Sequence, residues 1–202
     1  MNQPTQLTFI NEAADSGDVS VVFYQRNMAG GANDEPLAWH VIGQPARDKP
    51  YTFDVPAGLT IHLVDNWNNQ TPMHPVAPGD VFEVITDHSG ELLRPTSHAS
   101  LHPAEFEVHN GTPRVTFTAE VRRGDRPLAR KPNFAPGAKA HFAFRPTIWV
   151  AAVTQATPGA VLPPSPQAPT EFALPGAGSA TITMHGGGAA PLTFTMDLSA
   201  RR

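Results

Sequence analysis

The chain has 202 residues, no cysteine, 22 prolines, 16 glycines and a formal net charge of −4. A chain of this length can bury roughly 70% of its unfolded surface, so it can form a core without disulfides or metals. The lack of cysteine excludes disulfides, iron–sulfur clusters, thiolate zinc sites and cysteine nucleophiles. The balance of 14 basic against 18 acidic residues argues against a nucleic-acid partner.

Targeting signals are not visible at the start of the chain. Residues 1–18 have no basic region, no apolar run and no small-residue cleavage site of the kind a secretory signal needs. The longest apolar runs, such as 148–153, are far shorter than a membrane-spanning helix. We therefore expect a soluble, cytoplasmic protein with no membrane span, and export by a route without an N-terminal signal stays open.

Alternation of apolar and polar residues with a period of two dominates the chain and predicts strands. Each run is short, rich in β-branched and aromatic residues, and bounded by glycine, proline, asparagine or aspartate. The only short helix predicted covers 96–101. The predicted strands are, in chain order, 7–11, 18–25, 37–42, 51–55, 59–65, 80–87, 105–110, 113–123, 139–144, 147–153, 179–185 and 191–198.

Several turns between these strands have a specific sequence signature. Asn110-Gly111 predicts a tight hairpin between the strands on either side of it. Residues 123–126 (Arg-Gly-Asp-Arg) and the glycines 186–188 predict two further hairpins. Residues 77–80 and 135–138 carry the proline–glycine pair that is typical of β-turns.

These elements predict an all-β fold, an antiparallel β-sandwich of jelly-roll type. It forms either one domain over 1–202 or two closely joined lobes, 1–95 and 103–202. Residues 154–171 are rich in proline. Because too few residues follow them to make an independent domain, we interpret them as a surface connection within one domain.

Nine histidines raise the question of a metal site. His98 and His102 have the spacing of two ligands on one helix face, but Pro103 disfavours a helical His102, so we expect no metal there. The alternation around His62 places it on the face opposite Ile61 and Leu63, where we expect contact with solvent. The sequence thus predicts no cofactor.

Two carboxylates, Glu105 and Glu107, fall on the same face of one predicted strand. They would serve as the acid and base of a glycosidase only if one of them were strongly desolvated. Otherwise they belong to a solvated strand edge, which is the interpretation we favour.

The clearest candidate for a binding site is the polar stretch 65–70. It places Trp67 among Asp65, Asn66, Asn68 and Asn69. An exposed indole can stack on a pyranose ring while amides and a carboxylate bind its hydroxyls. Trp39 and Trp149 lie in predicted strands instead, where we expect them to pack in the core.

The first part of the chain resembles a family of uncharacterised bacterial β-rich proteins. The resemblance rests on Phe9 and Asn11, Val19 and Val21 with Tyr24-Gln25, and Leu37-Ala38-Trp39, and it covers about 35 residues. It implies a soluble β-protein and no activity.

We predict a non-enzymatic protein that binds a partner or assembles with itself as a structural protein. One alternative is a carbohydrate-binding module centred on Trp67, with a glycan as its partner. The other is a metal-dependent enzyme of cupin-like shape that uses some of the histidines. Residues 1–100 hold 12 acidic and four basic residues, and residues 101–202 hold six and 10. This split predicts a homo-oligomer that forms through unlike surfaces.

Overall fold

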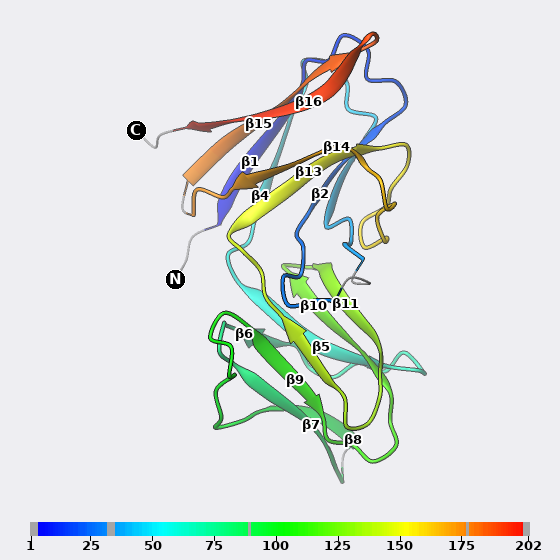
Figure 1. Cartoon of the computed structure of the whole chain (residues 1–202), viewed down its shortest axis with the longest axis vertical. Helices are drawn as coiled ribbons and strands as arrows, with labels where there is room; N and C mark the ends of the chain where they lie inside the picture. Colours follow the sequence, from blue (N-terminus) through cyan, green and yellow to red (C-terminus); the bar gives the residue numbers. More distant parts are fainter. Residues whose placement is uncertain (1–3, 32–34, 89, 177, 200–202) are drawn as a thin grey trace. The chain divides into compact units, whose positions relative to one another are not determined.

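The computed structural model describes residues 4–31, 35–88, 90–176 and 178–199. Its described residues form sixteen β-strands, β1 to β16, and no helix, so the predicted all-β class is confirmed (Figure 1). The helix predicted over 96–101 is wrong. The hydroxyl oxygen of Thr96 accepts the backbone N–H of His98 at 3.3 Å, a local turn bond that competes with a helix.

The chain divides into two compact units, and one is inserted into the other. Unit 1 consists of residues 1–26, 35–57 and 146–202, and unit 2 of residues 27–34 and 58–145. The boundary between the predicted lobes, at 95–103, therefore lies inside unit 2. Unit 1 is assembled from three separate segments because a strand from the start of the chain pairs with one from its end.

Unit 1 contains two four-stranded sheets, with strand orders β16–β15–β1–β4 and β14–β13–β2–β3. All pairs are antiparallel except β1 with β15, which is parallel. In Figure 1, β15 and β16 lie side by side at one edge of the first sheet. The bounds are β1 Thr5–Asn11, β2 Ser20–Tyr24, β3 His40–Gly43, β4 Pro50–Val55, β13 Thr147–Val153, β14 Gln167–Ala173, β15 Gly178–Gly187 and β16 Ala190–Ser199.

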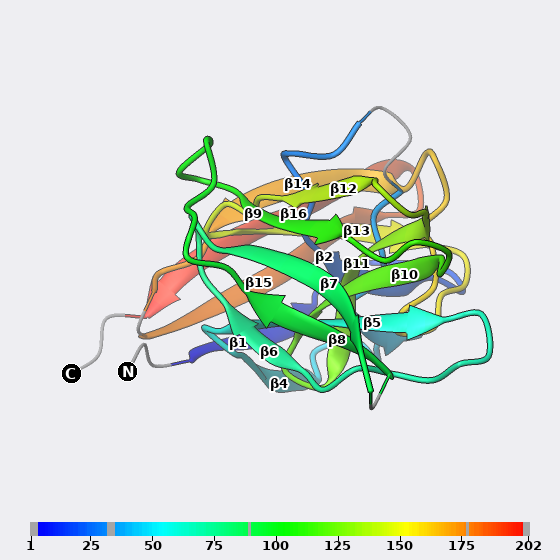
Figure 2. The ribbon, with the colours of Figure 1, turned by 90° about the horizontal axis from the view of Figure 1, so that it is seen from below.

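Unit 2 also contains two four-stranded sheets, with strand orders β11–β10–β5–β6 and β12–β9–β7–β8. Here the single parallel pair is β7 with β9. Figure 2 shows β7, β8 and β9 running beside one another in the second of these sheets. The bounds are β5 Leu59–Asp65, β6 His74–Val76, β7 Val81–Asp87, β8 Gly90–Pro95, β9 Phe106–Asn110, β10 Phe117–Arg123, β11 Arg126–Phe134 and β12 Lys139–Phe142.

Each unit buries the apolar faces of its two sheets against one another. In unit 2, the core joins Ile61 and Leu63 of one sheet to Val84 and Val108 of the other. In unit 1, the ring of Phe9 on β1 meets the ring of Phe23 on β2 edge to face, with 6.1 Å between the centroids. Packing of two sheets face to face is the sandwich arrangement that the alternation predicted.

The proline-rich segment 154–171 is only partly a connection. Its last five residues, from Gln167, form most of β14. Its earlier part covers the outer face of the β2–β13 sheet, where Leu162 packs with Val22 and Ala151 in a small second core. The backbone N–H of Leu162 donates to the carbonyl of Pro36 at 2.9 Å, which fixes the segment in place.

The two units do not inherit the charge difference between the halves of the sequence. Unit 1 contains eight acidic and five basic residues, and unit 2 contains 10 acidic and nine basic residues. Both units are therefore weakly acidic. The predicted attraction between an acidic lobe and a basic lobe loses its basis, because the insertion mixes the two halves.

Most of the predicted turns are confirmed. Residues 123–126 join β10 to β11 as a hairpin, and the glycines 186–188 lie in the β15–β16 hairpin. In the turns at 77–80 and 135–138, the last residue donates its N–H to the carbonyl of the first, at 3.1 and 3.0 Å.

The hairpin predicted at Asn110-Gly111 is wrong. β9 and β10 belong to different sheets, so the chain crosses between the two layers of the sandwich at this point. A Cβ atom on Gly111 would come within 2.8 Å of Glu83 and 2.9 Å of the backbone of Val84. The glycine is thus required by a close approach of two chain segments.

The side chain of Asn110 holds this crossing together. It is almost fully buried, with 1% of its surface exposed. Its Nδ2 atom donates to the carbonyls of Val115 at 2.9 Å and Phe134 at 2.8 Å, and its Oδ1 atom accepts the hydroxyl of Thr112 at 2.7 Å. One side chain therefore satisfies polar groups of three residues, two in the loop that follows it and one at the end of β11.

We expect Asn110→Ala to lower the free energy of unfolding by about 2 kcal/mol, because it leaves buried carbonyls without a donor. Denaturant titration of Asn110→Ala and of wild type measures this loss. Asn66→Ala, which removes an exposed asparagine side chain, is the control and should change stability by less than about 0.5 kcal/mol. Equal stability of the two variants would contradict the structural role of Asn110.

Candidate functional site

The most distinctive surface feature of unit 2 is the loop of residues 65–70 at the end of β5. Asp65 organises it through both carboxylate oxygens. Its Oδ1 atom accepts the backbone N–H groups of Trp67 and Asn69, each at 2.8 Å, and its Oδ2 atom accepts the side-chain amide of Asn69, also at 2.8 Å. The loop is therefore folded around one carboxylate.

Backbone contacts reinforce the same loop. The N–H of Asp65 donates to the carbonyl of Asn69 at 3.0 Å, and the N–H of Asn68 donates back to the carbonyl of Asp65 at 3.1 Å. Asn68 adopts a φ of +67°, a left-handed conformation that asparagine tolerates better than most residues. The amide-rich sequence of the loop is thus well suited to this conformation.

The charge of Asp65 is stabilised by these contacts. Partial desolvation by itself would raise the pKa of Asp65. Hydrogen bonds from the Asn69 side chain and from the N–H groups of Asn69 and Trp67 together outweigh this effect and bring the pKa below its ordinary value of 3.8. Hydrogen bonds to the charged form favour it. Asp65 is therefore an ionised acceptor at neutral pH.

The loop presents its tryptophan to solvent. The side chain of Trp67 is 78% exposed, whereas Trp39 is 3% exposed in the core. Asn66 and Asn68 are exposed on either side of it. Of the five residues predicted for a binding site, Asp65 and Asn69 hold the loop, and Trp67, Asn66 and Asn68 are the three whose side chains are available to a ligand.

A buried charged cluster on β5, β10 and β11 was not predicted. Glu120 accepts Nε2 of His62 at 3.1 Å, Nη1 of Arg122 at 2.6 Å and Nε of Arg130 at 2.6 Å. The prediction that His62 faces solvent is wrong. His62 does lie opposite Ile61 and Leu63, but it is 1% exposed because it pairs with Glu120 across the strands.

Register is the signal that could have revealed this cluster. His62 and Arg130 stand directly opposite Glu120 on the two strands that flank β10. Burial alone would raise the pKa of Glu120, but hydrogen bonds from His62 and the two arginines, together with the charge of Arg130, lower it from 4.5 to about 2. A carboxylate so firmly ionised is a structural anion and a poor proton donor.

The second acidic cluster lies on β9 and β12. Glu107 accepts the hydroxyl of Ser100 and interacts with Nε2 of His109 at 3.0 Å, and Glu105 lies 3.3 Å from Nδ1 of His141. The hydrogen bond from Ser100 is the main reason that the pKa of Glu107 falls below its ordinary value of 4.5.

The arrangement of these groups is unsuited to the reactions considered from the sequence. A glycosidase acid needs a raised pKa, and that of Glu107 is lowered. The Ser100 hydroxyl contacts the carboxylate of Glu107 and not an imidazole, so no histidine is placed to take its proton. Hydrogen bonds among Ser100, Glu107 and His109 instead join the loop before β9 to the sheet.

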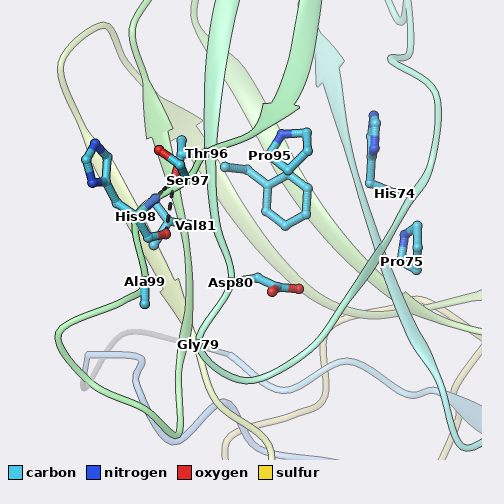
Figure 3. A pocket seen from close by; sticks show the side chains of 11 residues that line it. His74, Pro75, Gly79, Asp80, Val81, Pro95, Thr96, Ser97, His98 and Ala99 are labelled. Carbon is cyan, nitrogen blue, oxygen red and sulfur yellow. Dashed lines mark hydrogen bonds between the residues drawn. The ribbon is translucent and has the colours of Figure 1, made fainter.

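A shallow cavity of about 380 Å³ lies between the edge strands β6 and β8 of unit 2. His74 and His98 lie on opposite sides of it, with Asp80 between them (Figure 3). Asp80 already accepts the N–H of Ala77 at 2.8 Å through Oδ2. One carboxylate oxygen of Asp80 therefore serves the turn at 77–80.

His98 and His102, the pair weighed as metal ligands, both lie exposed in the loop between β8 and β9. Among the residues that the structure describes, no three histidine, aspartate or glutamate side chains are grouped closely enough to hold a metal ion. The described residues form no helix that is long and apolar enough to cross a membrane.

Comparison with known proteins gives no relative. Neither the family models, nor the curated proteins, nor the solved structures contain a match to this chain. The candidate site is thus defined by its own geometry: a β-sandwich unit that carries a hydrogen-bonded loop with an exposed tryptophan.

Proposed function

We propose that the chain is a non-enzymatic binding protein and that the loop of residues 65–70 is its recognition element. The observation that carries the proposal is the combination of an indole exposed over 78% of its surface with a loop held by the Asp65 carboxylate. The indole is a large flat apolar surface on a loop that Asp65 already holds in place, so a ligand ring can cover it without reordering the loop.

The chemistry of the loop favours a sugar ring as the ligand. The indole gives a flat apolar surface for the C–H face of a pyranose, and the amides of Asn66 and Asn68 can donate to and accept from hydroxyls. Because the Asp65 hydrogen bonds already order the loop, little conformational entropy is lost when a ligand binds. A neutral glycan is the partner that these groups suit best.

A glycan array followed by calorimetry tests this proposal with Trp67→Ala. We expect the substitution to weaken binding by about 30-fold, the effect of losing a central aromatic contact. Leu101→Ala is the matched control, because Leu101 is 92% exposed in another loop of unit 2. It should bind like wild type.

The contribution of the amides is tested separately. Asn68→Gly removes the side chain but keeps the left-handed backbone, since glycine adopts positive φ without strain. We expect it to reduce glycan affinity without unfolding the loop. Absence of any glycan ligand, or an affinity that Trp67→Ala leaves unchanged, would overturn the proposal.

A further inference from the structure

The eight strands at the edges of the four sheets are not equally protected against pairing with another chain. Exposed edges invite intermolecular pairing, and proteins protect them with short strands, prolines and bulges. Seven of the edge strands among the described residues are short or contain proline: β3, β4, β6, β8, β11, β12 and β14. β16 is ten residues long, and its single proline, Pro191, stands at its second position.

The sequence of β16 suits it for pairing. From Leu192 to Leu198 it contains leucine, threonine, phenylalanine and methionine, with Asp197 as its only charge. Its threonines and its phenylalanine have high β-propensity, and a segment of low charge without proline readily joins another strand. Among the described strands, β15 alone is hydrogen-bonded to β16, and β14 of the other sheet comes close to β16 without pairing with it. The backbone groups on the other side of β16 therefore have no partner strand.

An exposed apolar side chain lies on the same edge. Leu198 stands opposite Ala180, which is 1% exposed in the core, yet Leu198 itself is 63% exposed. It belongs to the core-facing row of β16 together with Phe194 and Met196, whose partners on β15 are the buried Met184 and Ile182. The core row of the sheet thus ends in an uncovered leucine.

We propose that two copies of this chain associate through β16, which pairs with itself in antiparallel orientation to join two four-stranded sheets into one of eight strands. A twofold axis that passes between the two Thr195 residues, perpendicular to the sheet, keeps core-facing residues opposite core-facing residues. Leu198 then meets Leu192, Phe194 meets Met196, and Asp197 meets Thr193. The exposed leucine gains an apolar neighbour, and the one charge faces a hydroxyl.

This self-complementarity is why the partner is a second copy. In the register centred on Thr195, every pair between 192 and 198 is apolar with apolar or polar with polar, as cross-strand pairs require. The interface is isologous, since both copies use the same surface. It replaces the association through unlike surfaces that the charge split suggested, and it does not depend on the proposed glycan site.

Cross-linking tests the register. The chain has no cysteine, so Thr195→Cys introduces the only thiol. The two introduced cysteines then face each other across the twofold axis with their sulfurs within disulfide distance, so we expect a covalent dimer under mild oxidation. Thr52→Cys on β4 is the matched control. Thr52 is also an exposed threonine at an edge of the same sheet. Each threonine makes one side-chain hydrogen bond, Thr52 to Thr8 and Thr195 to His185.

Sedimentation of the full chain tests the association without a thiol. Thr193→Asp places an aspartate opposite Asp197 of the other copy, and the twofold axis repeats this like-charge pair, so we expect the dissociation constant of the dimer to rise about tenfold. Thr193→Lys places a cation there and should not weaken the dimer. A monomer at every protein concentration, or cross-linking of Thr195→Cys no faster than that of Thr52→Cys, would overturn the proposal.

Discussion

Gly187→Ala is expected to lower the free energy of unfolding by more than about 3 kcal/mol, the range reached when backbone strain and steric overlap act together. Gly187 has a φ of +86°, and a Cβ atom there would overlap the backbone of Asp15. The Asp15 segment cannot easily move away, because the N–H groups of Glu12 and Ala14 donate to the carbonyls of Met184 and Gly186 at 2.9 and 2.8 Å.

Gly188→Ala is the control for this prediction. Gly188 also has positive φ, +61°, but nothing lies within 4 Å of the position its Cβ would take. We expect a loss of about 1 kcal/mol, which is the conformational cost alone. Denaturant unfolding of the two variants separates steric overlap from conformational strain. Similar losses in both would mean that the segment before β2 is not packed against β15 as described.

The sequence identified strands better than it identified their partners. Alternation over 113–123 marked the strand β10, and residues 123–126 marked the hairpin turn after it, because both signals are local. The strand beyond that turn, β11, was not among the predicted strands. Asn110-Gly111 carried an equally strong local signal for a hairpin, but β9 and β10 lie in different sheets. The same two residues serve a crossing, and only contacts with distant segments distinguish the two cases.

The insertion of unit 2 into unit 1 was beyond the reach of local patterns for the same reason. β1 pairs with β15, some 170 residues away, and nothing in the period of either strand specifies that partner. The predicted division at 95–103 falls inside unit 2, because the two units follow long-range strand pairing and not the order of the strands along the chain. The charge argument assumed that each half of the sequence forms a lobe, and the two units do not follow these halves.

The candidate site shows the same contrast. The Trp67 loop was found from sequence because its residues are consecutive and its conformation depends on Asp65, two to four residues away. The cluster around Glu120 was not found, because His62 and Arg130 reach it from other strands. An alternating polar position predicts which face a side chain occupies, but not whether neighbouring arginines will cover it.

The Glu120 cluster should make the stability of the protein depend on acid. Its pKa of about 2 in the folded state lies below the ordinary value of 4.5, so between these values the unfolded chain binds a proton that the folded chain does not. The stability that ionised Glu120 contributes is therefore fully present above pH 4.5 and is lost as the pH falls towards 2. The difference in pKa corresponds to about 3 kcal/mol.

Glu120→Gln tests this linkage. The glutamine has a similar shape but no charge to balance Arg122 and Arg130, so we expect the variant to be about 3 kcal/mol less stable than wild type at pH 7. The difference between the two proteins should shrink as the pH falls from 4.5 to 2, because wild-type Glu120 becomes protonated. Urea unfolding at several pH values measures this difference in stability.

Glu83→Gln is the control, because Glu83 is an exposed glutamate on β7, and its stability should match that of wild type at every pH. Glu107 also has a lowered pKa and is present in all three proteins, so its contribution cancels in the comparison. A difference between wild type and Glu120→Gln that stays constant with pH would show that the carboxylate is not held as an ion by His62 and the two arginines.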